Sequence, residues 1–123
     1  MVRLIGGQGR DILIGGAGQA TLQAGAAGDI LIGGTTAYDN NAAALAALLA
    51  EWGRTDIDYT TRIAHLKSSS GGGLNGTYLL NTSTIYSNGL ADNLYGGAGL
   101  DWYFAGVLDL LFNQTTGEVI TTI

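Results

Sequence analysis

Apolar residues recur every nine positions over the first third of the chain. Each unit opens with a glycine-rich turn and ends in a short apolar run: residues 6–14 read GGQGRDILI, residues 15–23 GGAGQATLQ and residues 24–32 AGAAGDILI. Leucines hold one phase of this period, at Leu4, Leu13, Leu22 and Leu31. A strand this short cannot bury its apolar side chain alone, so successive units must stack with the leucines inside. The pattern therefore predicts a mainly β fold, a β-solenoid with one strand per nonapeptide.

This repeat resembles the RTX, or hemolysin-type, nonapeptide GGxGxDxUx of calcium-binding parallel β-rolls. The resemblance covers residues 3–34, and residues 92–104, DNLYGGAGLDWYF, fit it again. In such a roll two nonapeptides make one coil, so positions nine apart lie on opposite sheets and positions eighteen apart lie one above the other. The wider layout is similar to a C-terminal module of large secreted bacterial proteins. The resemblance therefore implies a parallel β-roll, bound calcium and type I secretion.

Calcium takes roughly six to eight oxygen ligands, which a β-roll supplies from turn carbonyls and from aspartates of neighbouring turns. Asp11 and Asp29 are eighteen residues apart, so they are predicted to lie in adjacent coils at one edge, whereas Ala20 takes that place at the other edge. The predicted metal ligands are these two aspartates with the turn residues Gly6, Gly7, Gly9, Gly25 and Gly28, and Asp101 as a weaker candidate. At most one well-formed Ca²⁺ site is supported.

Several substitutions depart from the repeat pattern. Ala24 and Ala27 stand where the pattern has glycine, and a left-handed turn at alanine costs roughly 1 kcal/mol or more. Arg10 places a positive charge beside the predicted site. A solenoid that keeps its glycine turns without metal is therefore the alternative.

The nonapeptide rhythm stops at Thr35, and a helical insert (about 40–68) is predicted to follow. The run AAALAALLAEW predicts a helix to about Trp52, with Asp39 or Asn40 as its cap. A second helix is predicted over 60–67, with Thr60 or Thr61 as its cap. Residues 68–73, SSSGGG, predict a loop.

Isoleucines predict where this insert packs. They flank the inward leucines of two units and point out of one sheet, which makes an apolar exterior that needs a cover. Thr21 and Gln23 take these places on the other sheet. We expect the insert to pack on the Asp11/Asp29 sheet and to leave the Thr21/Gln23 sheet in water.

The repeat is predicted to resume after the insert, because Ile85, Leu94, Tyr103 and Phe112 continue the nine-residue spacing. We expect one domain over 1–123, made of the repeats (1–34), the insert and loop (35–73) and a β-rich continuation and cap (74–123). Strands are predicted at 78–80, 84–86, 93–95, 101–104, 110–112 and 118–121. Asp92 and Asp101 have no acidic residue eighteen positions away, which favours turn residues over metal ligands.

The composition and the motifs of the chain argue against several classes of function. Ten acidic residues against five basic ones give a net charge of −5, which argues against a nucleic-acid partner. The longest apolar stretch, 42–50, is too short to span a bilayer. His65 is the only histidine, cysteine is absent, and the serines at 68–70 lack a nucleophile-elbow motif, so the chain is predicted not to be an enzyme.

Asp56 and Asp58 are predicted to stabilise the start of the second helix.

These patterns predict a non-catalytic, calcium-binding folding and export module of a secreted or cell-surface protein. The alternative is a metal-free structural or adhesive solenoid that binds a partner, a glycan or itself through its edge. Met1 enters in the middle of a repeat, so a fragment of a larger protein is expected.

Overall fold

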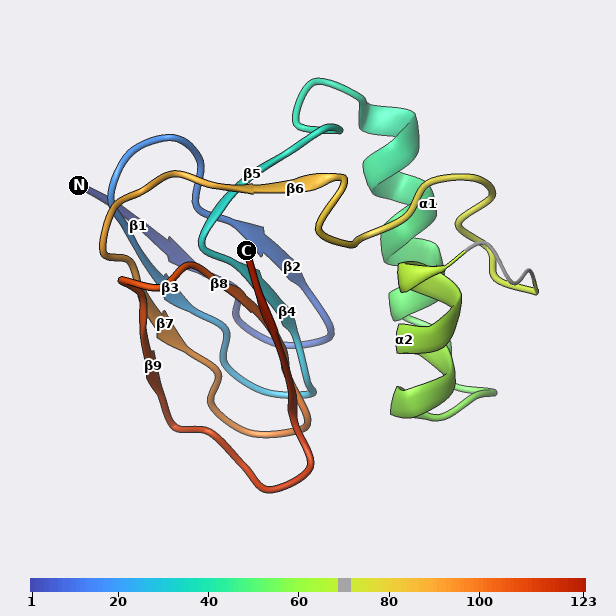
Figure 1. Ribbon diagram of the computed structural model, residues 1–123. Helices are drawn as coiled ribbons and strands as arrows, with labels where there is room; N and C mark the ends of the chain where they lie inside the picture. The colour runs from blue at the N-terminus through green and yellow to red at the C-terminus, as the bar shows by residue number, and fades with distance from the viewer. Residues whose placement is uncertain (69–71) are drawn as a thin grey trace.

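The computed structural model describes residues 1–68 and 72–123 and is mainly β, with two parallel four-stranded sheets and two helices (Figure 1). Sheet A has the order β1–β3–β7–β9 and sheet B the order β10–β8–β4–β2. Sheet A comprises β1 (Val2–Ile5), β3 (Ala20–Gln23), β7 (Asn93–Tyr95) and β9 (Leu110–Phe112). Sheet B comprises β2 (Ile12–Ile14), β4 (Ile30–Ile32), β8 (Trp102–Ala105) and β10 (Val119–Thr122). The predicted mainly β class with parallel pairing is confirmed.

The nine-residue period sets the strand pairing. Leu4 pairs with Leu22 in sheet A and Leu13 pairs with Leu31 in sheet B, so paired positions are two nonapeptides apart in the sequence. Positions nine apart therefore lie on opposite sheets, as predicted. The inward side chains of the two sheets form one apolar cluster between them: Leu13, Leu22, Ala24, Leu31, Leu94, Tyr103 and Ala105.

The sheets continue in phase beyond the insert. Leu22 pairs with Leu94 in sheet A, and Leu31 pairs with Tyr103 in sheet B. Both pairings span a whole number of nonapeptides in the sequence. The inward positions therefore keep their nine-residue spacing, even though the residues of the insert lie outside both sheets.

The return to the sheets is later than predicted. Residues 78–80 form no strand, and β6 (Ile85–Ser87) pairs antiparallel with β5 (Gly34–Thr36), outside sheets A and B. Ile85 therefore does not continue the repeat, and residues 74–91 belong with the insert. Part of the predicted loop, residues 69–71, lies outside the described residues.

The predicted phase of Phe112 is also wrong. Leu111, not Phe112, lies opposite Leu94, so this last pairing in sheet A falls one position short of two nonapeptides. Phe112 instead stacks against Tyr95 on the outer face of sheet A, with ring centroids 4.4 Å apart.

Two helices form the insert, and both begin at caps other than those predicted. Helix α1 (Ala42–Trp52) is capped by Asn41, whose side chain accepts from the amide of Ala44. Helix α2 (Tyr59–Lys67) is capped by Asp58 in the same way. Among the described residues, neither helix has the length and apolar character needed to cross a membrane.

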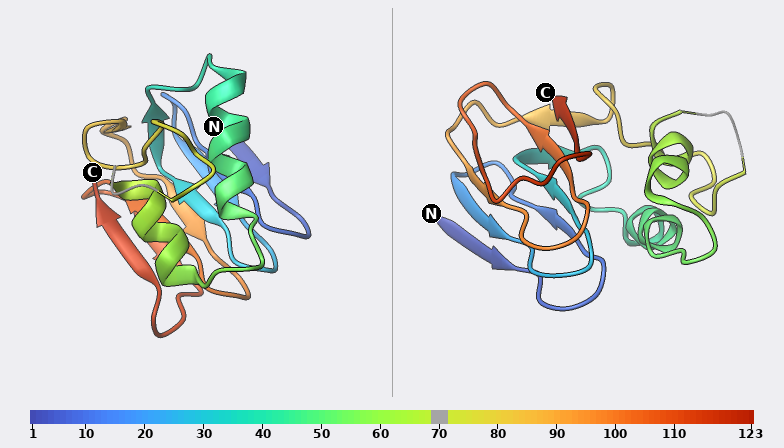
Figure 2. Two further views of the ribbon diagram at one scale, coloured as in Figure 1. Left: turned by 90° about the vertical axis from the view of Figure 1, so that its right-hand side faces the viewer. Right: turned by 90° about the horizontal axis from the view of Figure 1, so that it is seen from below.

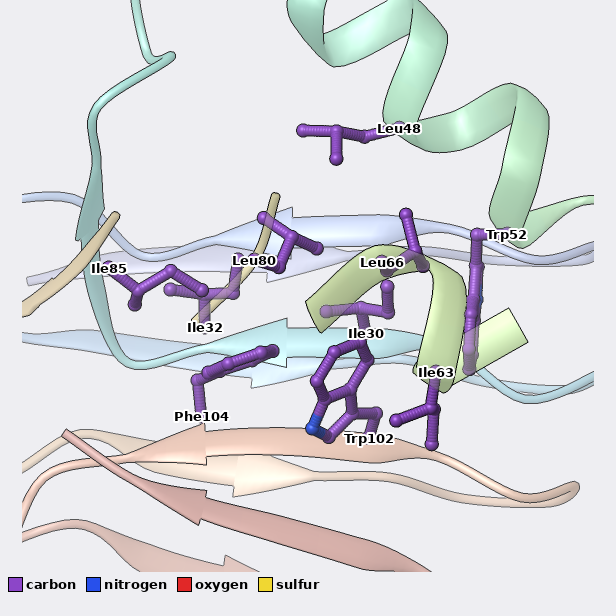
Figure 3. Close-up of a cluster of buried hydrophobic side chains, with 10 residues drawn as sticks. All are labelled: Ile30, Ile32, Leu48, Trp52, Ile63, Leu66, Leu80, Ile85, Trp102 and Phe104. Carbon is purple, nitrogen blue, oxygen red and sulfur yellow. The ribbon is translucent and has the colours of Figure 1, made fainter. Parts of the chain in front are cut away.

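Both helices lie on the outer face of sheet B, as predicted (Figures 1 and 2). They bury a second apolar cluster, shown in Figure 3, that contains the outward side chains of β4 and β8: Ile30, Ile32, Leu48, Trp52, Ile63, Leu66, Leu80, Ile85, Trp102 and Phe104. Trp52 also donates its indole N–H to the carbonyl of Gly28. This contact joins α1 to a glycine turn at the edge of the sheets.

Candidate functional site

Four acidic residues form a row along one edge of the two sheets. Each ends a turn that leads from a strand of sheet A into a strand of sheet B. Because parallel pairing places these turns above one another, the acidic side chains follow each other in the order of the strands. We call this row the carboxylate ladder; it consists of Asp11, Asp29, Asp101 and Glu118.

Backbone amides connect the members of the ladder. The amide of Asp11 donates to Oδ1 of Asp29 at 2.6 Å, and the amide of Asp29 donates to Oδ1 of Asp101 at 2.6 Å. The amide of Asp101 donates to Oε2 of Glu118 at 2.7 Å. Each turn is therefore tied to the next by a hydrogen bond from a backbone amide to a carboxyl group.

The second carboxylate oxygen of each aspartate has no such partner. Within the described residues, Oδ2 of Asp11, Asp29 and Asp101 is buried and accepts no hydrogen bond. Asp29 and Asp101 have no exposed surface at all. A buried charged oxygen without a donor costs several kcal/mol, so each of these atoms needs a proton or a cation.

The pKa values express the same cost. Burial raises the pKa of Asp29 to about 7. The hydrogen bond from the Asp11 amide lowers this pKa, and the negative charge of the Asp11 side chain raises it. Burial is the largest of the causes that raise the pKa of Asp101 to about 8, and the neighbouring Glu118 raises it further. Burial also raises the pKa of Asp11. Without a counter-charge, Asp29 and Asp101 therefore keep a proton much closer to neutral pH than an exposed aspartate does.

Glycine turns surround these oxygens. A Cβ on Gly6 would lie 2.6 Å from the carbonyl oxygen of Ala24 and 2.7 Å from Oδ2 of Asp11, so only glycine fits there. A Cβ on Gly96 would collide with Oδ2 of Asp101 and with the Tyr103 hydroxyl, which is itself buried without a partner among the described residues. The predicted turn glycines with a left-handed backbone are Gly7, Gly9, Gly25 and Gly28.

Of the two alanines that replace pattern glycines, only Ala27 has a positive φ, of 77°. Ala24 belongs to the apolar cluster between the sheets and has none. Of these two alanines, only Ala27 therefore carries the expected strain.

The opposite edge also carries carboxylates, which contradicts the prediction that it had lost them. The amide of Ala20 donates to Oδ1 of Asp92 at 2.7 Å, and the amide of Asp92 donates to Oδ1 of Asp109 at 2.9 Å. Here the second oxygens are paired: Asn88 Nδ2 donates to Oδ2 of Asp92, and the amide of Gly106 donates to Oδ2 of Asp109. The second oxygens of this edge therefore already accept hydrogen bonds.

The structure thus brings the predicted ligands Asp11 and Asp29 together with the weaker candidate Asp101, and it adds Glu118 to them. The prediction that Asp101 lacks a carboxylate partner is wrong, because the insert places its neighbour 72 residues before it and Glu118 17 residues after it. A search for acidic residues at multiples of nine positions from Asp101 would have found Asp29. Glu118 follows a shortened unit and escapes that search.

Within the described residues, no three acidic, histidine or cysteine side chains are grouped so as to hold a metal ion. A calcium ion at the ladder would therefore take one or two carboxylates and complete its shell from turn carbonyls, as hard cations with oxygen ligands do.

Charged side chains of the insert have structural partners. Glu51 is fully buried and accepts from His65 Nδ1 at 2.8 Å and from the amide of Leu74 at 2.7 Å. Asp58 caps α2, as its predicted stabilising role requires, whereas Asp56 pairs with Arg54. The hydrogen bond from Arg54 lowers the pKa of Asp56 to about 2.

Comparison with known proteins gave no match to any family model, any curated protein or any solved structure.

Proposed function

We propose that this chain is a non-catalytic, calcium-stabilised β-roll of the RTX type, acting as a folding module of a secreted protein. The observation that carries the proposal is the row of buried, unpartnered Oδ2 atoms of Asp11, Asp29 and Asp101 within the described residues. These atoms lie at stacked glycine turns, whose carbonyl groups would supply further oxygen ligands. A divalent cation with oxygen ligands suits this donor set, because no cysteine is present and the only histidine pairs with Glu51.

The contrast between the two edges supports the choice of site. Both edges stack carboxylates through backbone amides, but in the described part of the chain only the ladder leaves second oxygens without donors. At the other edge the Asn88 side chain supplies the missing donor to Asp92. One edge is therefore closed by hydrogen bonds, and the other is left for a cation.

Folding and cation binding would be linked. Ionised carboxylates placed in one row repel each other, and each loses hydration on burial. A ligand that binds only the folded chain stabilises it by RT ln(1 + [L]/Kd). Low calcium, as in a cytoplasm, would favour the unfolded chain, and higher calcium outside the cell would favour the fold. This linkage suits a chain that is exported unfolded by type I secretion.

A metal-free structural or adhesive module is the second candidate. It is favoured by the amide bonds that already join the turns through Oδ1 without any ion. In that case protonation of Asp29 and Asp101 removes the repulsion within the carboxylate ladder, and the stability of the fold does not depend on calcium.

Thermal unfolding with calcium and with chelator separates the two candidates. We expect calcium to raise the Tm of the chain at pH 8, and Asp29→Asn to abolish this shift, because the amide keeps the size of the side chain but removes its charge. Asp92→Asn is the matched control at the closed edge and should keep the full shift. A Tm that does not respond to calcium, or a response lost equally in both variants, contradicts the calcium site.

A further inference from the structure

A pocket of about 380 Å³ lies between the turns of the strand stack and the start of α2. Two of the side chains that line it are arginines, Arg10 from the turn before β2 and Arg62 from α2. Among the described residues neither of them forms an ion pair, whereas Arg54 pairs with Glu51 and Asp56. The pocket therefore brings together two guanidinium groups that are not paired with a carboxylate.

Arg62 is buried, and its hydrogen bonds are incomplete. Its exposed fraction is 5%, and its guanidinium carbon lies 4.7 Å from the ring centre of Trp52. Its Nη1 donates to the carbonyl of Ile57 at 3.3 Å. Within the described part of the chain, Nε has no acceptor and Nη2 makes no hydrogen bond. The Trp52 ring attracts the positive charge, but a buried cation that lacks hydrogen-bond acceptors remains costly.

Arg10 is fixed beside the same pocket and keeps donors to spare. Its Nη1 donates to the carbonyls of Trp52 and Arg54, at 3.4 and 2.6 Å. Over residues 1–68 and 72–123, its Nε and Nη2 make no hydrogen bond. Burial lowers the pKa of the Arg62 guanidinium, and the charge of Arg10 lowers it further. The two side chains therefore repel each other unless an anion lies beside them.

One carboxylate borders the pocket. Asp58 is exposed, and its Oδ1 accepts from the amide of Thr61, so that it caps α2. In the described residues it forms no ion pair with either arginine. Asp58 offsets one of the two positive charges, which leaves the lining of the pocket with a net positive charge.

We propose that this pocket binds a small oxyanion, a carboxylate, phosphate or sulfate group, between Arg10 and Arg62. The anion accepts from Nη2 of Arg62 and from the uncommitted donors of Arg10. Guanidinium groups suit such a ligand because their N–H groups match its oxygen atoms in geometry and charge. Arg10 belongs to the strand stack and Arg62 to the insert, so the bound anion joins these two parts of the fold. The site uses no residue of the carboxylate ladder and does not depend on calcium.

Titration of the ¹⁵N-labelled full chain with sodium sulfate, followed through the Nε–H signals of its arginines, tests the proposal. The buffer is free of metal at pH 6, and sodium chloride keeps the ionic strength constant. We expect saturating shifts of the Arg10 and Arg62 signals. Arg3 and Arg54 are controls within the same molecule, because they donate to Gln23 and Asp56, and they should not respond.

A second titration with sodium acetate identifies the type of oxyanion. Saturation by sulfate alone assigns a phosphate or sulfate group, and saturation by acetate assigns a carboxylate. Saturation by neither anion overturns the proposal, as do shifts that grow linearly with anion concentration or are equal at all four arginines.

Variants of the lining give an independent test. Arg62→Gln and Arg10→Gln should each weaken binding of the anion by at least about tenfold. Arg3→Gln, on the outer face of sheet A, is the matched control and should leave binding unchanged. Asp58→Asn keeps a side chain that can cap α2 but removes the opposing charge, so it should tighten binding by about threefold. Unchanged binding in Arg10→Gln, or weaker binding in Asp58→Asn, overturns the proposal even if Arg62→Gln fails to fold.

Discussion

The amide of Asp29 donates a 2.6 Å hydrogen bond to Oδ1 of Asp101, although 72 residues separate the two positions. The whole helical insert lies between them in the chain, and yet their turns are neighbours in the stack. The insert is therefore an excursion from a continuous stack of strands, and its helices return to cover sheet B.

Metal-free stability should fall as the pH rises from 6 to 8.5. The pKa values of Asp29 and Asp101 are raised from 3.8 to about 7 and about 8 in the folded chain. A raised folded-state pKa gives stability that is complete below the unfolded value and is lost as the pH rises through the folded value. Urea unfolding in chelator at the two pH values measures this loss.

The double variant Asp29→Asn/Asp101→Asn is the control for this pH dependence. It should flatten the profile between pH 6 and 8.5, because neither side chain can then ionise. Stability of the parent chain that increases over this range would contradict the protonated ladder.

Asn88→Ala should make the closed edge resemble the ladder. The Asn88 amide donates to Oδ2 of Asp92 at 2.9 Å and to the carbonyls of Gly16 and Gly18. Its loss leaves a buried carboxylate oxygen without a donor, which costs about 1–3 kcal/mol. We expect this loss of unfolding free energy in urea unfolding at pH 8.

Asn40→Ala is the comparison for Asn88→Ala, since Asn40 is exposed. It should change the unfolding free energy by less than about 0.5 kcal/mol. An effect of Asn88→Ala no larger than that of Asn40→Ala would show that the Asn88 side chain does not stabilise the Asp92 carboxylate.

Leu48→Ala should test how firmly the insert is joined to the sheets. Leu48 is 1% exposed in the cluster between the helices and sheet B, so its truncation should cost ~2–5 kcal/mol. Leu49→Ala, on the adjacent exposed face, should cost clearly less. Chemical denaturation of both variants gives the comparison, and equal costs would mean that α1 does not pack on sheet B through this face.

Leucine spacing was enough to predict much of the fold. A period of nine with inward Leu4, Leu13, Leu22 and Leu31 predicts alternating sheets and pairing across two nonapeptides, because burial of one apolar side chain per short strand requires stacking. The outward isoleucines predicted the side on which the helices pack. These features depend on which side chains of each repeat are buried, and the pattern of apolar residues indicates that directly.

Other features depend on contacts that local patterns do not contain. Asp101 looked isolated because its ladder neighbour lies across the insert. Glu118 joins the ladder after a unit shortened by one residue, and its longer side chain makes this contact. The role of Asn88 depends on tertiary placement beside Asp92. Helix caps moved by one to three residues, because several adjacent polar side chains could serve as caps and packing selects among them.

The most direct measurement is a crystal structure of the chain grown with calcium, with an anomalous difference map. We expect a peak at the carboxylate ladder, with oxygen atoms at about 2.3–2.6 Å that include Oδ2 of Asp29. No peak is expected beside Asp92 and Asp109. An ion-free ladder at saturating calcium, or a peak at the closed edge alone, would contradict the proposed site.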